Sequence, residues 1–148
     1  ALADTSRYQQ ANKNEKLGRD MKKVIATSAA PAAIGTYSQA VSHQGVLYIS
    51  GQIPLDPESM EIQSGDIRAQ IVRVFDNLVA ICDAADTDLS HALKLNIYLT
   101  DLKTLALLNE VMSQYVPEPF PARAAVEVSA LPKGVDVEID AMVSGAVE

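Results

Sequence analysis

The stretch Leu93-Lys94-Leu95-Asn96-Ile97-Tyr98-Leu99 alternates strictly, with leucine or isoleucine at every second position. This period of two is typical of a strand with one buried face and one open face. The strand stands between two segments whose apolar residues recur every three or four positions, which is the spacing of an amphipathic helix. A strand enclosed by two helices predicts an α+β domain built on one sheet.

The two flanking helices have plausible starts and a clear stop. Ser64 or Asp66 can cap the first helix, and Thr100 or Asp101 can cap the second. Prolines within residues 117–121 end the second helix and force an extended chain after it. The predicted apolar faces comprise Ile67, Ile71, Val74, Phe75, Leu78 and Cys82 in the first helix, and Leu105, Leu108, Val111, Met112 and Tyr115 in the second.

Four further strands complete the predicted sheet. Residues 37–41 and 46–50 flank a four-residue connection that ends in glycine, which predicts a hairpin. Residues 124–128 and 135–143 are two apolar strands that close the chain. The order of the elements predicts one mixed sheet with both helices packed on one face.

We expect the apolar side chains of every strand to face the helices. Arg123 and Glu138 then lie together on the other face of the sheet, which also carries Ala125, Met142 and Tyr98. A sheet covered on one side only would leave these apolar groups in water. Self-association through this face would cover them, so we expect a homo-oligomer with sites at or near its subunit interfaces.

Arg123 and Glu138 are the candidate functional residues. Arg123 stands at the head of a small apolar strand and needs an anionic partner, and its planar fork fits a carboxylate or phosphate. Glu138 stands alone between Val137 and Ile139, where it can orient a water or move a proton. Two interpretations remain open: a site for a small anionic molecule, or a structural ion pair of Arg123 with Glu138 or Glu127.

Composition sets the class of protein. With 148 residues, of which 48% are apolar, the chain fits a globular domain, and no apolar run approaches the ~20 residues that cross a bilayer. The single cysteine and the absence of a signal-peptide core favour the cytoplasm. The net charge of −7 disfavours nonspecific binding to nucleic acid or an anionic membrane. We expect residues 1–20 to be a disordered or helical, vector-derived extension, and residues 21–148 to form a single domain.

Other reactive side chains have ordinary interpretations. His43 and His91 belong to no metal-binding pattern, so no metal site is predicted. Cys82 lies on an apolar helical stripe and is expected in the core. Lys94 is either a solvated strand lysine or a Schiff-base lysine. Ser50 is either a hydroxyl donor to a ligand or a strand-end serine bonded to backbone.

Four motifs stand out along the chain. They are Pro121-Ala122-Arg123 with Val126, Leu131 and Val137-Glu138-Ile139; residues 33–40; residues 49–54; and Asp101-Leu102 followed by Asn109. Together they resemble the RidA (YjgF) family of enamine and imine deaminases, and the likeness runs from about residue 25 to residue 142. The resemblance implies a chorismate-mutase-like α+β fold, a homotrimer with sites between subunits, and no cofactor.

The resemblance also implies a reaction, in which reactive enamine or imine acids such as 2-aminoacrylate are hydrolysed to 2-oxo acids and ammonia. Arg123 would clamp the substrate carboxylate, and Glu138 would orient and help to deprotonate a water. Tyr37 and Ser50 would line the pocket. Gly51 and Ala125 would offer main-chain groups, and Asn109 matches a position common in active members.

This chain departs from the family pattern in three places. Ala125 stands where many members have cysteine, and Thr36 replaces a frequent proline. The segment between the second helix and Phe120 is a few residues shorter than in close relatives, which could reshape the pocket mouth.

Three functions are compatible with the resemblance. The first is a cytoplasmic, trimeric 2-iminobutanoate/2-iminopropanoate deaminase that removes imines leaking from pyridoxal-phosphate enzymes. The second is a non-catalytic module that binds small carboxylates in the same cleft. The third is the ribonuclease or translation-inhibitor activity attached to some relatives, which the acidic charge and the lack of a basic patch disfavour.

Overall fold

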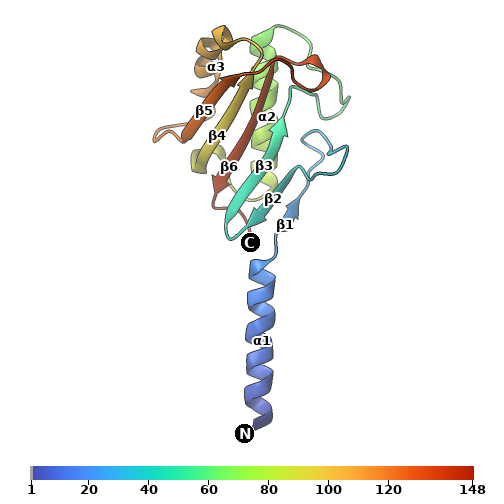
Figure 1. The fold of residues 1–148 in the computed structure, drawn as a ribbon, viewed down its shortest axis with the longest axis vertical. Helices are drawn as coiled ribbons and strands as arrows, with labels where there is room; N and C mark the ends of the chain where they lie inside the picture. The colour runs from blue at the N-terminus through green and yellow to red at the C-terminus, as the bar shows by residue number, and fades with distance from the viewer. Residues whose placement is uncertain (1) are drawn as a thin grey trace.

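The computed structural model describes residues 2–148, in which one mixed sheet carries two helices on one face (Figure 1). The six strands lie in the order β1-β2-β3-β6-β4-β5, and only the β4–β5 pair is parallel. The predicted α+β class is therefore confirmed. The elements are α1 Leu2–Asp20, β1 Lys23–Ile25, β2 Ala40–His43, β3 Val46–Gln52, α2 Ile67–Ala84, β4 Ala92–Leu99, α3 Leu105–Met112, β5 Ala122–Glu127 and β6 Val137–Ser144.

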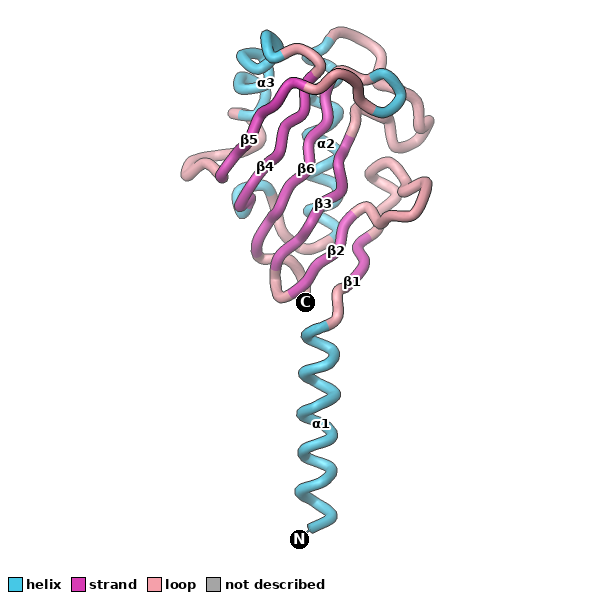
Figure 2. The backbone as a smooth tube through the Cα atoms, in the orientation of Figure 1, coloured by secondary structure: helices cyan, strands magenta, loops and turns pink. Residues whose placement is uncertain are grey.

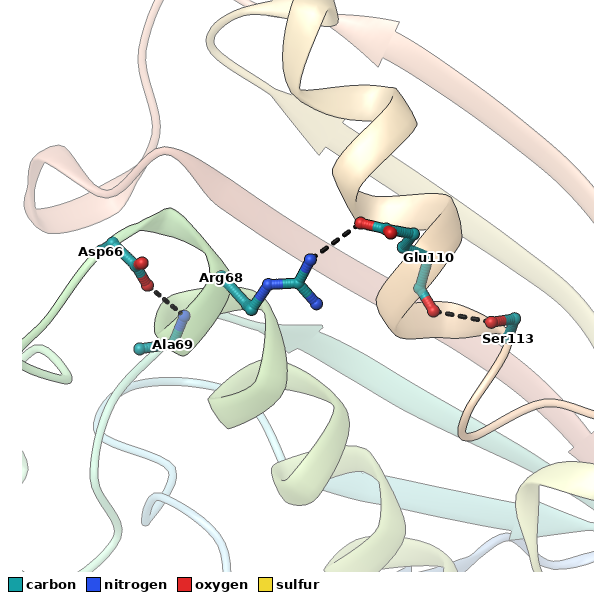
Figure 3. A network of polar contacts seen from close by, with 5 residues as sticks. All are labelled: Asp66, Arg68, Ala69, Glu110 and Ser113. Carbon is teal, nitrogen blue, oxygen red and sulfur yellow. Dashed lines mark hydrogen bonds and ion pairs between the residues drawn. The ribbon is translucent and has the colours of Figure 1, made fainter.

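Helix α2 packs on the sheet through the face that the sequence predicted. Ile71, Val74 and Phe75 are completely buried, and Cys82 lies in the same core. Asp66 caps the helix, because its side chain accepts a hydrogen bond of 3.0 Å from the Ala69 N–H (Figure 3). The prediction of this helix and of one of its two candidate caps is confirmed.

Helix α3 lies beside α2. An ion pair of 2.8 Å joins Arg68 to Glu110 across the two helices, but both side chains are largely exposed, so the pair adds little stability (Figure 3). Asp101 caps a 3-10 turn, Leu102–Thr104, that leads into α3. The helix ends at Met112 rather than reaching Tyr115, whose ring instead stacks on Phe75 with 5.1 Å between centroids.

The first hairpin differs from its prediction. The connection is the two-residue turn Gln44-Gly45, and β2 occupies residues 40–43 instead of 37–41. Both turn residues have positive φ, at 50° and 78°, as a tight hairpin turn requires. The prediction places Ser42 and His43 in the connection, whereas both continue β2 and pair with Leu47 and Val46. Strand β1, three residues long, was too short to be predicted.

Strand β5 also differs from its prediction. It runs parallel to β4, with Leu95 opposite Arg123 and Ile97 opposite Ala125. Paired residues point to the same face, so Arg123 and Ala125 lie on the helix face beside two buried core residues. Val126 lies on the other face and is 45% exposed. The predicted assignment of Arg123 to the face away from the helices is therefore wrong.

Contacts at the edge of the sheet explain why the β5 side chains are placed this way. Arg123 reaches α3, where its guanidinium donates to Asn109, and the Glu127 carboxylate accepts from the Leu102 N–H at 3.0 Å. These polar contacts hold alternate side chains of β5 toward the helices. The small apolar residues of this strand offer little contrast between its faces, so hydrophobic pattern alone indicated the wrong one.

We call the face of the sheet opposite α2 and α3 the open face. It carries Tyr48, Tyr98 and Met142, together with the exposed Val126 of β5. The prediction that Tyr98 and Met142 lie away from the helices is confirmed, whereas Ala125 packs against the core on the helix side.

Residues Leu2–Asp20 form α1, a helix that extends away from the sheet (Figures 1 and 2). The side chains of residues 5–18 are exposed. Within residues 2–148, none of the helices combines the length and the apolar character that a bilayer span requires.

Candidate functional site

Glu138 projects from β6 onto the open face, because its neighbours Val137 and Ile139 fill the core. It lies opposite Tyr98 of β4. Burial raises the pKa of its carboxyl, and the nearby Asp140 carboxylate raises it further. A carboxyl with a raised pKa can exchange a proton closer to neutral pH than an ordinary glutamate can.

Asp140 is fixed on the same face, two residues further along β6. Its carboxylate accepts a hydrogen bond of 2.7 Å from the Asn96 side-chain amide and one of 3.0 Å from the Tyr98 hydroxyl. Both donors come from β4. These two hydrogen bonds fix the position of the Asp140 carboxylate beside Glu138.

A cavity of about 560 Å³ opens beside Glu138 and also contains Asp140. It brings together four residues that the sequence singled out, namely Tyr37, Ser50, Gly51 and Glu138. Loop residues that the sequence reasoning missed complete it, among them Ile53, Leu55, Met60 and Lys133. No periodic pattern marks such loop positions, so they become visible only once the loops are placed.

Gly51 lies against the Glu138 carboxyl group. A Cβ on Gly51 would lie 2.9 Å from Cδ of Glu138, closer than real Cβ contacts. The backbone of Gly51 has no positive φ, so this glycine is required for space and not for conformation. It lets β3 approach the carboxyl group closely.

Ser50 and Tyr37 occupy the side of the cavity formed by β3 and the loop before β2. The Ser50 hydroxyl donates to the Ser38 carbonyl at 2.6 Å, which matches the interpretation of a strand-end serine bonded to backbone. Tyr37 is 51% exposed, and its hydroxyl accepts a weak hydrogen bond of 3.4 Å from the Ile34 N–H. Its ring is thus available to a ligand.

Arg123 belongs to a second polar group, on the helix face at the β5 edge. Its Nη1 donates to the Asn109 side-chain oxygen and lies 3.9 Å from Sδ of Met112, both on α3. Within the described part of the chain Arg123 forms no ion pair, since Glu127 caps the Leu102 N–H instead. The interpretation of Arg123 as a structural ion pair is therefore wrong.

Arg123 and Glu138 lie on opposite faces of the sheet, with β4 between their strands. The expectation that they share one face on neighbouring strands is not met. Ala125 and Asn109 belong to the Arg123 side, whereas Tyr37, Ser50 and Gly51 belong to the cavity around Glu138. The candidate residues thus form two separate half-sites within one chain.

The remaining reactive side chains add nothing to either half-site. Cys82 is buried in the core as predicted, and burial raises the pKa of its thiol to about 12. Lys94 is exposed to water, which matches the interpretation of a solvated lysine. Among the side chains that the structure describes, no three from His, Cys, Asp or Glu cluster as a metal site would require.

Comparisons with known proteins agree with this fold. A profile of the family described as Endoribonuclease L-PSP matches residues 27–144. A RutC family protein of Pyrococcus horikoshii is 48% identical over 122 residues, which cover 82% of this chain and 97% of that protein. The human protein named 2-iminobutanoate/2-iminopropanoate deaminase is 42% identical over 122 residues, which cover 82% and 89% of the two chains.

Solved structures lead to the same grouping. The crystal structure of RidA from an Antarctic Psychrobacter is 52% identical in sequence, with a TM-score of 0.79, and the match covers 82% of this chain and 98% of that one. The chain belongs to the RidA (YjgF) family.

Proposed function

We propose that the chain is a hydrolase that deaminates 2-iminobutanoate, 2-iminopropanoate and related enamine acids such as 2-aminoacrylate to 2-oxo acids and ammonia. The observation that carries the proposal is an exposed arginine with no carboxylate partner among the described residues, together with a carboxyl group of raised pKa beside a cavity. Relatives named 2-iminobutanoate/2-iminopropanoate deaminase support the choice of substrate.

The active unit that we propose is a homotrimer with sites between its subunits. A small molecule can meet Arg123 and Glu138 at once only if two copies of the chain bring a β5 edge against an open-face cavity. The exposed Tyr48 and Val126 on the open face support such an assembly, because a second copy would remove them from water.

In this assembly Arg123 binds the substrate carboxylate through its planar fork, and Asn109 fixes the guanidinium by accepting one of its hydrogen bonds. The clamp holds the imine carbon near a water. Glu138 takes a proton from the water as the water oxygen adds to the C=N carbon, and it gives that proton to the imine nitrogen. The hydroxyl proton of the tetrahedral intermediate then passes through Glu138 to the same nitrogen as the C–N bond breaks, which releases ammonia and forms the C=O bond of the 2-oxo acid. A raised pKa suits a carboxyl group that must both accept and donate.

We place this activity in the cytoplasm, as a means of removing reactive imines that leak from pyridoxal-phosphate enzymes. The one cysteine is buried and free, which suits a reducing compartment. No resident cofactor enters the proposed reaction, since water and protein side chains supply every proton transfer.

The tests can also favour either of two other functions. A non-catalytic module would bind small carboxylates through Arg123 without needing Glu138. The family description names an endoribonuclease, but the net charge of −7 opposes binding to a polyanion. Salt-dependent RNA binding by the pure assembled protein would favour that function.

A coupled assay tests the proposal. A pyridoxal-phosphate threonine dehydratase generates the imine from threonine or serine, and release of the 2-oxo acid is followed with and without the protein. We expect acceleration that Arg123→Ala removes and that the control Arg7→Ala, in the exposed helix α1, retains. No acceleration from folded and assembled protein would contradict the deaminase and favour the binding module.

A further inference from the structure

Two loops that line the Glu138 cavity are each attached to the body of the protein by one buried carboxamide. Gln39, only 4% exposed, lies just before β2 and reaches the loop at residues 27–31. Its side-chain nitrogen lies 2.9 Å from the carbonyl of Thr27, 3.2 Å from that of Ala30 and 2.8 Å from that of Pro31. Its side-chain oxygen accepts from the Thr27 N–H at 2.7 Å.

Asn77 attaches the loop after β3 in the same way, through hydrogen bonds of its side-chain amide. It is fully buried in the middle of α2, and its side-chain nitrogen donates to the carbonyls of Ile53 at 3.3 Å and Leu55 at 3.1 Å. Its side-chain oxygen accepts from Nε of Arg73 at 3.1 Å, so the amide orientation is fixed as well.

Neither set of contacts belongs to a strand ladder or a helix. The carbonyls of Ala30, Pro31 and Leu55 lie at buried residues, where an unpaired polar group is costly. Each carboxamide therefore fixes the position of a loop that the sheet does not hold. The first loop leads to Tyr37, and the second leads through Ile53 and Leu55 to Met60.

We propose that Gln39 and Asn77 are positioning residues, which hold two walls of the cavity at the distance from Glu138 that the substrate requires. The inference rests on the proposed deaminase function for its kinetic consequence. Gln39 itself lines the cavity, whereas Asn77 does not, so Asn77 can affect a ligand only through the loop that it holds.

Loss of either attachment should weaken substrate positioning more than it weakens the fold. Misplacement of binding groups by about 1 Å can cost on the order of 100-fold in rate. We expect kcat/KM to fall on the order of 10- to 100-fold in each variant, with a rise in KM making up a large part of the loss. The melting temperature should fall only as far as it does in a control variant that loses a hydrogen bond of a buried side chain elsewhere in the protein.

The variants Gln39→Met and Asn77→Leu keep the approximate size of each side chain and remove its hydrogen bonds. Gln39→Glu is a second variant, which keeps the acceptor for the Thr27 N–H but loses the donors to the carbonyls. Ser42→Ala is the matched control, because it removes the hydrogen bond of 2.9 Å that the hydroxyl of the buried Ser42 donates to the Val147 carbonyl, away from the cavity.

The test combines steady-state kinetics with hydrogen–deuterium exchange on the assembled protein, at a temperature where circular dichroism shows every variant folded. We expect Gln39→Met to speed exchange in residues 27–37 and Asn77→Leu to speed it in residues 53–63, each with raised KM. Ser42→Ala should change the melting temperature and leave kcat and KM unchanged. Gln39→Glu should be at least as impaired as Gln39→Met, because it sets a carboxylate oxygen against the carbonyl oxygens of the loop.

Two results would overturn the inference. One is unchanged local exchange in both variants, and the other is a wild-type kcat/KM from folded Gln39→Met and Asn77→Leu. If the wild type itself hydrolyses no imine, the proposed function fails instead. The positioning role is then decided by exchange together with the affinity for 2-oxobutanoate, which must weaken in both variants and not in Ser42→Ala.

Discussion

The contact between Gly51 and Glu138 leaves no room in the candidate site for even one more side-chain atom at position 51. The carboxyl group occupies space that any side chain at position 51 would need. The geometry of Glu138 is therefore set by a neighbour that has no functional group of its own. This contact could not be predicted from sequence, where Gly51 suggests only a main-chain contact or a turn.

Gly51→Ala should move the Glu138 carboxyl group and reduce kcat on the order of 100-fold, because the added Cβ lies 2.9 Å from its Cδ. The fold should persist, since the partly exposed Glu138 side chain can rotate away. Steady-state kinetics with the dehydratase-coupled assay would measure the effect. Gly18→Ala is the control, as nothing lies within 4 Å of its added Cβ. Equal kcat values for Gly51→Ala and wild type would contradict the proposed role of Glu138.

Asp140→Asn should shift the pH dependence of the reaction. The Asp140 charge raises the pKa of Glu138, so neutralising it lowers that pKa, although the larger effect of burial remains. A base that loses its proton at lower pH becomes active at lower pH. The acidic limb of the plot of kcat/KM against pH should therefore shift to lower pH. Asp86→Asn removes the same charge at a distant turn and should leave the profile unchanged. A pH profile that shifts to higher pH, or that does not shift, would exclude Asp140 as a cause of the raised pKa of Glu138.

At the scale of elements, predictability followed the strength of the hydrophobic pattern. Helix α2 and strand β4 have long, regular patterns, and both formed as predicted. Strand β5 has small residues on both faces, so polar contacts to α3 decided its orientation against the apparent pattern. Gln39 and Asn77 read as ordinary polar residues in the sequence, because their partners are backbone groups of distant segments.

The β2–β3 turn gives a test at this scale. Gly45 has a φ of 78°, so Gly45→Ala should lower the free energy of unfolding by about 1 kcal/mol. Gln44 has a φ of 50°, and Gln44→Asn should raise that free energy by about 0.5 kcal/mol, because asparagine tolerates this region better. Chemical denaturation measures both changes. Effects of the same sign would show that turn conformation does not control stability here.

At the scale of the whole molecule, the separation of Arg123 from Glu138 predicts complementation between inactive variants. Arg123→Ala and Glu138→Gln should each abolish turnover, while Glu138→Gln should still bind 2-oxobutanoate. In mixed trimers some interfaces would pair an intact Arg123 from one subunit with an intact Glu138 from the next. Random mixing at equal amounts should restore about a quarter of the wild-type sites in a cyclic trimer.

The measurement is the activity of the two variants after they are unfolded and refolded together, compared with each variant refolded alone. Size-exclusion chromatography with light scattering would show the assembly state of each sample. Activity that fails to recover in correctly assembled mixtures would contradict a site shared between subunits.

The opposite orientation of Arg123 and Glu138 also has a consequence for how activity depends on dilution. If the site is shared between subunits as proposed, a newly synthesised chain would carry both groups without being able to use them on the same molecule, and it would be inert until it met other copies. Specific activity should then fall when the protein is diluted below the dissociation constant of the assembly. The abundance of the chain in a cell would set the number of active centres and also the fraction of chains that work at all.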